Sequence, residues 1–80
     1  MHEARAVAEI LRAAEAAAEG ARIGRIAVRI EGDEHLTPQL VRTHLRALAA
    51  RSHPSLDVDV IVDRAAPGPG IRLLTVDVEA

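Results

Sequence analysis

The chain has 80 residues, a formal net charge of −2, and no cysteine, phenylalanine, tryptophan or tyrosine. A chain of this length forms one domain, and a core of aliphatic side chains leaves little room for a deep pocket for an organic substrate. The missing cysteines exclude disulfides and thiolate zinc sites, and the acidic balance without aromatic rings argues against nucleic-acid binding.

Residues 3–20 predict an amphipathic helix, because apolar side chains recur at helical spacing. These side chains are Val7, Ile10, Leu11, Ala14 and Ala18. Gly20 is a typical residue at a helix end. The segment is charged throughout and lacks the apolar core of a signal peptide. No stretch of the chain is apolar enough to span a membrane. We therefore expect a cytoplasmic protein.

Residues 23–31 alternate in polarity, which predicts a strand with one buried face. The buried face consists of Ile26, Val28 and Ile30. The opposite face consists of Arg25, Ala27, Arg29 and Glu31. The polar sequence GDEHL then predicts a loop.

Residues 38–51 predict a second helix, with Thr37 as its N-cap and Pro38 in its first position. Its inward side chains are expected to be Val41, Leu45, Leu48 and Ala49. The sequence SHPS predicts the end of this helix.

Two further strands are expected, over residues 56–63 and 71–78, joined by the stiff turn APGPG. Asp57, Asp59 and Asp63 share one face of the earlier strand, which favours a solvated surface over a calcium site. The last strand is apolar on both sides for part of its length, which indicates a central position in the sheet or a partly covered second face.

The predicted order is α-β-α-β-β, which corresponds to one α+β domain over residues 1–80. Its most economical packing is a three-stranded sheet with both helices on one face. The last two strands are expected to be antiparallel neighbours or near neighbours across the short turn, and the pattern leaves the strand order open.

This order also predicts which segments lie at the same end of the sheet. The start of the first helix, the GDEHL loop and the APGPG turn share one end, so Met1, His2 and Glu3 become neighbours of the acidic and histidine side chains there. Those side chains are Asp33, Glu34, His35 and Asp63. His53 is expected at the opposite end, and His44 midway along the second helix. Both are interpreted as surface or helix-packing residues.

The sequence MHE at the amino terminus offers two interpretations, a frayed end or a metal site. A free amine on Met1, the amide nitrogen of His2 and the His2 imidazole are three nitrogen donors on one short segment. Ni(II) and Cu(II) can displace the amide proton, and both favour tetragonal nitrogen sites. The Glu3 amide, a carboxylate or a second histidine would fill the fourth position.

The whole pattern resembles the HypA/HybF family of hydrogenase nickel-incorporation proteins over nearly all of the chain. The likeness starts with MHE and the amphipathic helix that ends near Gly20. It continues through GARIGRIAVRIE, TPQL, SLDVDVIVD and GIRLLTVDVE, which look like the family's first strand, second helix start, second strand and closing strand. MHE is the most specific of these segments.

The resemblance implies a small nickel metallochaperone that binds Ni(II) through Met1, His2 and Glu3. Members of the family deliver nickel for [NiFe]-hydrogenase maturation, and in some organisms for urease, together with a HypB-type GTPase. The expected partners are therefore such a GTPase and a hydrogenase large-subunit precursor. No catalytic residue is implied, and we do not expect an enzyme.

Two departures from the family pattern affect the expected site. The family carries a zinc domain with two Cys-x-x-Cys pairs before its last strand, whereas residues 64–70 here form only a short turn, so we expect no zinc. The position before the helix proline is often acidic in the family and is Thr37 here. Glu34 or His35 in the adjacent loop would compensate, and both are candidate ligands.

These departures motivate an alternative, a metal-free protein-interaction module derived from the same family. In that case the chain keeps the fold but only docks on a GTPase or on a hydrogenase precursor. The last strand, apolar on both sides, is a candidate surface for a homodimer.

Overall fold

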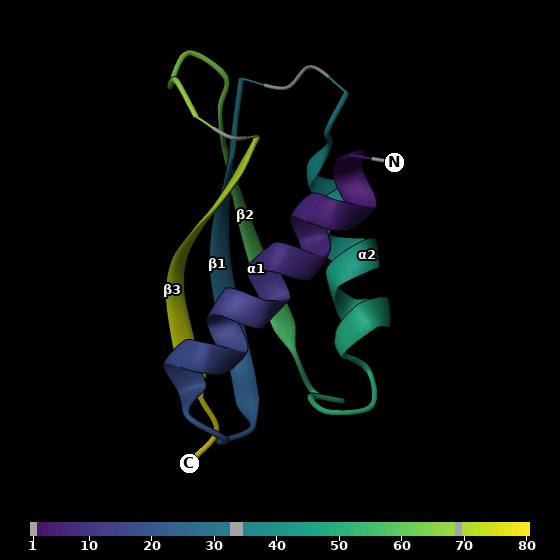
Figure 1. The fold of residues 1–80 in the computed structure, drawn as a ribbon, viewed down its shortest axis with the longest axis vertical. Coiled ribbons are helices and arrows are strands. Elements are labelled where there is room, and N and C mark those ends of the chain that lie inside the picture. Colours follow the sequence, from purple (N-terminus) through teal and green to yellow (C-terminus); the bar gives the residue numbers. More distant parts are fainter. Residues whose placement is uncertain (1, 33–34, 69) are drawn as a thin grey trace.

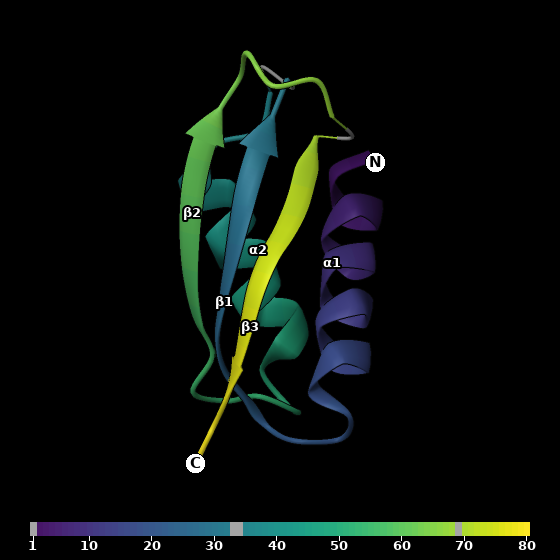
Figure 2. The ribbon, with the colours of Figure 1, turned by 90° about the vertical axis from the view of Figure 1, so that its left-hand side faces the viewer.

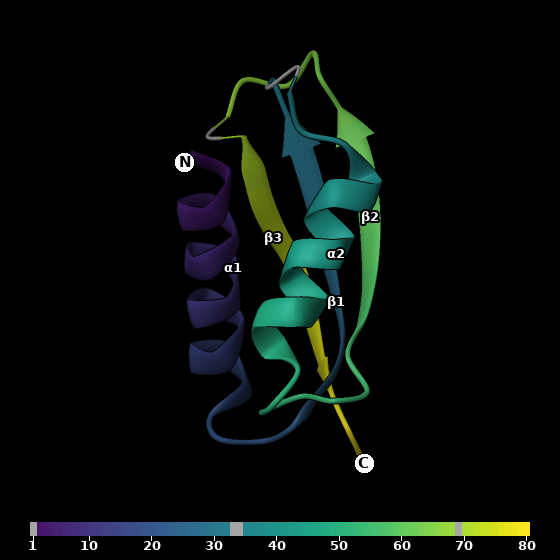
Figure 3. The same cartoon turned by 90° about the vertical axis from the view of Figure 1, so that its right-hand side faces the viewer.

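A computed structural model describes residues 2–32, 35–68 and 70–80, without the side chain of His2. The elements in chain order are α1 (His2–Ala18), β1 (Ile23–Glu31), α2 (Pro38–Ala49), β2 (Asp57–Asp63) and β3 (Ile71–Val78). Both helices lie against the same face of the sheet (Figure 1). Figure 2 shows the uncovered face of the sheet, and Figure 3 shows the two helices side by side in front of it. The predicted α+β arrangement is confirmed.

The strand order is β2-β1-β3, with β1 parallel to β2 and antiparallel to β3. The last two strands are thus antiparallel with one strand between them, so of the two arrangements expected, near neighbours is confirmed and direct pairing is not. Strand β1 is central because it pairs on both of its edges, and its inward side chains are entirely buried. Strand β2 carries three aspartates, and charged side chains are typical of an edge strand.

The expectation of a central last strand is also wrong, because β3 forms an edge. Ala27 pairs with Thr75 and Val28 pairs with Leu73, so Leu74 is an extra residue between the two pairs. Such an irregularity interrupts the alternation of side chains along the strand. Consecutive apolar residues in this strand therefore mark a bulge, and Leu74 is partly exposed.

The core lies between the helices and the sheet and is entirely aliphatic. All five residues predicted for the inner face of α1 are buried. In α2, Val41, Leu45 and Ala49 are buried at intervals of four residues, but Leu48 is 53% exposed. The inward placement of Leu48 is wrong because it lies to one side of that stripe, toward α1.

The helix ends follow the expected chemistry. Helix α1 ends at Ala18, and Glu19 and Gly20 then have φ values of 52° and 89°. The Leu40 amide donates a 3.2 Å hydrogen bond to the Thr37 hydroxyl, which confirms the predicted N-cap of α2. Among the described helices, neither is long and apolar enough to cross a membrane.

The predicted arrangement of the two ends is confirmed for the segments that the structure describes. The start of α1, the chain after β1 and the connection between β2 and β3 lie at one end of the molecule (Figure 1). His53 follows α2 at the opposite end, and His44 lies within α2.

Candidate metal site

Glu3 and His44 bring the first turn of α1 into contact with α2. Nδ1 of His44 lies 2.5 Å from Oε2 of Glu3. This oxygen is buried but accepts no hydrogen bond from any described residue, so the close approach lacks hydrogen-bond geometry. A buried carboxylate oxygen without a donor is costly and calls for an explanation, such as an ion. The pair is therefore a candidate for part of a metal site.

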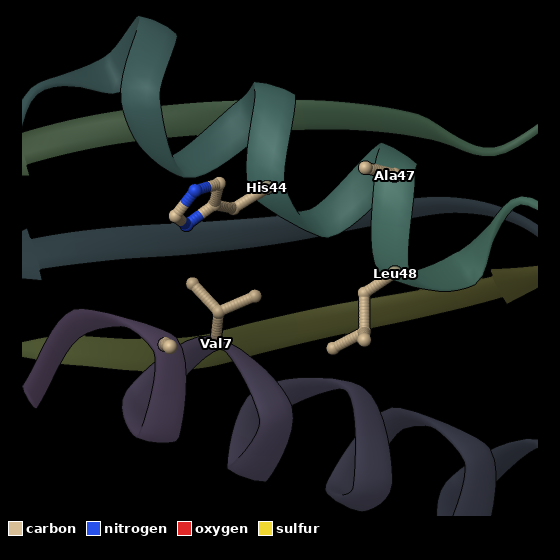
Figure 4. Close-up of a pocket in the computed structure, with 5 residues that line it drawn as sticks. Val7, His44, Ala47 and Leu48 are labelled. Atoms are coloured by element: carbon tan, nitrogen blue, oxygen red, sulfur yellow. The ribbon is translucent and has the colours of Figure 1, made fainter. Parts of the chain in front are cut away.

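The position of His44 follows from the packing of the two helices. His44 projects from α2 toward α1 and lies beside Val7 (Figure 4). It lines an apolar groove of about 340 Å³ together with Ala4, Val7, Ala47 and Leu48. The side chain of His44 is 46% exposed and that of Glu3 is 24% exposed, so an ion has access to the pair from solvent.

Sequence reasoning placed His44 correctly along the helix but missed its contact with Glu3. The signal available was its position three residues after Val41 and one before Leu45, on the flank of the buried stripe. That flank faces whichever element packs beside α2, and the sequence pattern did not identify α1 as that neighbour.

The other predicted site residues have separate outcomes. Met1, Asp33 and Glu34 lie outside the described residues, and of His2 only the backbone is described, as the first residue of α1. His35 is exposed in the segment between β1 and α2. The residues with described side chains contain no group of three or more histidine, aspartate or glutamate side chains that could hold a metal ion.

His53 is buried, so of its two interpretations, a surface residue or a helix-packing residue, the first is wrong. The Ile23 amide donates a hydrogen bond of 2.9 Å to its Nδ1. Because Nδ1 accepts, the proton of the neutral ring is on Nε2, which lies 3.0 Å from Oε2 of Glu15. Both ring nitrogens are thus engaged, and His53 is unsuited to bind a metal.

The aspartates of β2 form a solvated surface, as expected. Arg25 lies 3.2 Å from Asp57 and 3.4 Å from Asp59, and all three side chains are more than half exposed. Asp63, at the end of the strand, is also exposed. The aspartates with described ion pairs therefore contact an arginine on the neighbouring strand instead of converging on a cation.

Glu31 was expected on the open face of the sheet, but its side chain is fully buried. Arg29 donates a 2.7 Å hydrogen bond to its carboxylate and Arg72 donates one of 3.1 Å. Gly68 from the connection between β2 and β3 lies directly over the carboxylate. The hydrogen bond from Arg29 lowers the pKa of Glu31 below its ordinary value of 4.5, and Arg72 reinforces this effect against burial, which raises the pKa.

Comparison with known proteins identifies the fold. Two helices over a β2-β1-β3 sheet, with a histidine and a carboxylate in contact across the helices, define a small α+β domain. The solution structure of the Ni metallochaperone HypA from Helicobacter pylori matches it with a TM-score of 0.78, at 16% identity, over 100% of this chain and 99% of that chain. No family model and no curated protein sequence matches. The chain thus has a HypA-like fold.

Proposed function

We propose that this protein is a nickel-binding metallochaperone whose site is formed by Met1, His2 and Glu3. The observation that carries the proposal is the buried Glu3 oxygen without a hydrogen-bond donor, next in sequence to His2. The same fold occurs in a protein described as a Ni metallochaperone. A carboxylate withdrawn from water beside an imidazole is a suitable environment for a divalent cation.

The donor set explains a preference for nickel over zinc. With a free amine on Met1, the amine, the His2 amide and the His2 imidazole supply three nitrogens, and Ni(II) is able to displace the amide proton. The chain has no cysteine to build a thiolate zinc site. The metal is a cargo, and the partly exposed side chain of His44 beside Glu3 is compatible with loading and release.

The biological setting follows from the family resemblance. Residues 1–80 act as a single cytoplasmic domain that passes Ni(II) toward a [NiFe]-hydrogenase large-subunit precursor, in contact with a HypB-type GTPase. The protein itself performs no reaction. Residues 64–70 replace the family's zinc domain, so nickel delivery here proceeds without a zinc-dependent signal.

Calorimetric titration of Ni(II) tests the proposal in protein whose chain begins at Met1. We expect His2→Ala and a one-residue extension before Met1 each to weaken binding by more than about 100-fold, because even loss of a supporting residue around a metal costs 10- to 100-fold. A one-residue extension after Ala80 is the matched control and should leave binding unchanged. Equal affinity in all four proteins would overturn the proposal.

A metal-free interaction module is the second candidate, and the exposed Leu48 in the groove between the helices favours it. In that case the GTPase should bind equally well with and without a nickel chelator, and Leu48→Ser should weaken binding while His2→Ala does not. If binding of the GTPase requires nickel, the metallochaperone function is favoured instead.

A further inference from the structure

We infer that the free edge of β2 binds an extended segment of a partner protein in which apolar and basic side chains alternate. Strand β2 pairs with β1 along one edge only. Figure 2 shows β2 on the outside of the sheet, with no further strand beyond it. A free edge presents unpaired backbone groups, and partners recognise such edges by adding a strand. This surface is separate from the candidate metal site and does not depend on the proposed function.

The first half of this edge is closed at Val58. The Val58 amide donates a 3.1 Å hydrogen bond to the Asp57 side chain, and the Val58 carbonyl accepts one of 3.1 Å from Nε of Arg42. Both backbone groups of Val58 therefore point away from β1 and are satisfied by side chains. Arg42 reaches the edge from α2, so its side chain keeps a further strand from pairing at this position.

The second half of the edge is accessible at Val60 and Val62. Backbone groups alternate in direction along a strand, so both residues point their amides and carbonyls away from β1, as Val58 does. Val62 is 43% exposed and the adjacent Ile61 is 52% exposed, so solvent reaches the strand here. An antiparallel partner strand would exchange backbone hydrogen bonds with Val60 and Val62.

The side chains of this half define which segment fits. Val60 and Val62 share the face toward the helices, where Val60 packs against the core. Ile61 lies on the outer face between Asp59 and Asp63. Residues directly opposite one another in antiparallel strands contact on each face. The matching segment therefore has three apolar residues opposite the apolar side chains, flanked by a basic residue opposite each aspartate.

The outer face beside this edge is acidic. Asp57 and Asp59 share one partner, Arg25, which lies on β1. Arg64, the first basic residue after β2, donates a 2.6 Å hydrogen bond to the carbonyl of Leu36, which precedes α2. Among the described ion pairs, the three aspartates of β2 thus have a single arginine partner. This charge favours a basic partner strand.

A second copy of the chain fits this edge less well. Two β2 strands that pair antiparallel through Val60 and Val62 would be related by a twofold axis at Ile61. Asp59 of each copy would then lie opposite Asp63 of the other, and like charges directly opposite one another are destabilising. A basic segment from another protein meets the same positions with the opposite charge.

Titration of ¹⁵N-labelled protein with the acetylated, amidated peptide KVIVK tests the inference by NMR. We expect saturable shifts of the Val60 and Val62 amides and slower hydrogen exchange at both, because each gains an acceptor on the peptide. The Val58 amide already has the Asp57 side chain as its acceptor and should keep its exchange rate. The charge-reversed peptide EVIVE should bind more weakly.

Two matched comparisons separate backbone pairing from charge attraction. N-methylation of both peptide valines removes the amides that face β2 and should abolish binding, whereas N-methylation of the isoleucine, whose amide faces solvent, should not. Asp63→Lys should weaken binding of KVIVK about 3- to 10-fold and strengthen binding of EVIVE. Asp77→Lys changes an exposed residue of the other edge strand and should alter neither. Circular dichroism checks that both variants keep the fold.

Three outcomes would overturn the inference. If neither peptide shifts the Val60 and Val62 amides, the aspartates only keep strands away from this edge. If KVIVK and EVIVE bind equally and Asp63→Lys changes neither, charge does not select the partner. If the free protein is a dimer in analytical ultracentrifugation and both amides are already protected, a second copy occupies the edge.

Discussion

The backbone amide of Ile23 donates a hydrogen bond to Nδ1 of His53, 30 residues later in the chain. His53 also contacts Glu15 through Nε2 and is 6% exposed. One imidazole thus connects the start of β1, the helix α1 and the segment after α2. This histidine stabilises the end of the molecule opposite the candidate metal site.

Replacing His53 should therefore destabilise the fold. We expect His53→Ala to lower the free energy of unfolding by about 1–3 kcal/mol, because the buried Ile23 amide loses its acceptor. Urea denaturation measures this change. Glu15→Gln is the control: it keeps an oxygen for the Nε2 proton and should cost less than about 1 kcal/mol. Equal effects of the two substitutions would contradict the assigned role.

The carboxylate of Glu31 should make stability depend on pH. Its pKa is lowered in the folded state, chiefly by Arg29. Its contribution is therefore complete above the unfolded value near 4.5 and is lost as the pH falls through the lower folded value. Urea denaturation of the unaltered protein and of Glu31→Gln, between pH 7 and pH 3, should give a difference in unfolding free energy that shrinks on acidification. A difference that is constant with pH would exclude this linkage.

Gly68 should tolerate no side chain while Glu31 is present. A β-carbon at this position would overlap the Glu31 carboxylate, which Arg29 and Arg72 hold in place. We expect Gly68→Ala to cost about 1–3 kcal/mol through overpacking. In a double-mutant cycle, the cost should fall when Glu31 is replaced by alanine, because the clash is removed. Additive effects would show that Gly68 is required for another reason.

The two leucines of α2 should respond very differently to truncation. Leu45 is fully buried, whereas Leu48 is half exposed in the groove beside α1. We expect Leu45→Ala to cost about 2–5 kcal/mol and Leu48→Ala about 0.5 kcal/mol or less. Thermal or urea denaturation measures both. A large loss for Leu48→Ala would mean that this side chain belongs to the core after all.

The N-cap of α2 gives a prediction that combines stability with charge. Thr37→Ala should cost about 0.5–2 kcal/mol, since the Leu40 amide loses its acceptor. Thr37→Asp should preserve stability, because aspartate also caps helices well and its charge favours a helix start. Urea denaturation of both variants checks this. If Asp destabilises as much as Ala, the capping hydrogen bond is not the source of the effect.

Local chemistry was sufficient to predict the elements, but not their contacts. Helical spacing, alternation in the strands and the cap at Thr37 predicted the helices and strands to within a few residues of their observed bounds. The strand order and the bulge at Leu74 are both set by pairing between strands. Alternation alone gave no indication of either.

The same limit applies to the candidate site. The family resemblance pointed to Glu3, but the contact of His44 with Glu3 depended on which element packs beside α2. Likewise, the Glu31 side chain lies on the outer face of the sheet, as predicted. It is buried only because the connection between β2 and β3 covers it. Contacts between segments far apart in sequence determine both outcomes.

The connection between β2 and β3 is a place where the chain can accept an insertion. It must carry the chain from one edge of the sheet to the other, past the end of β1, where Gly70 accepts a hydrogen bond from the Glu31 amide. A longer segment inserted there would project beyond the end of the sheet and displace no strand or helix. A domain added to this connection would lie at the same end of the molecule as the start of α1 (Figure 1). The fold can therefore accommodate a further domain next to the candidate metal site while the three strands and two helices stay as they are.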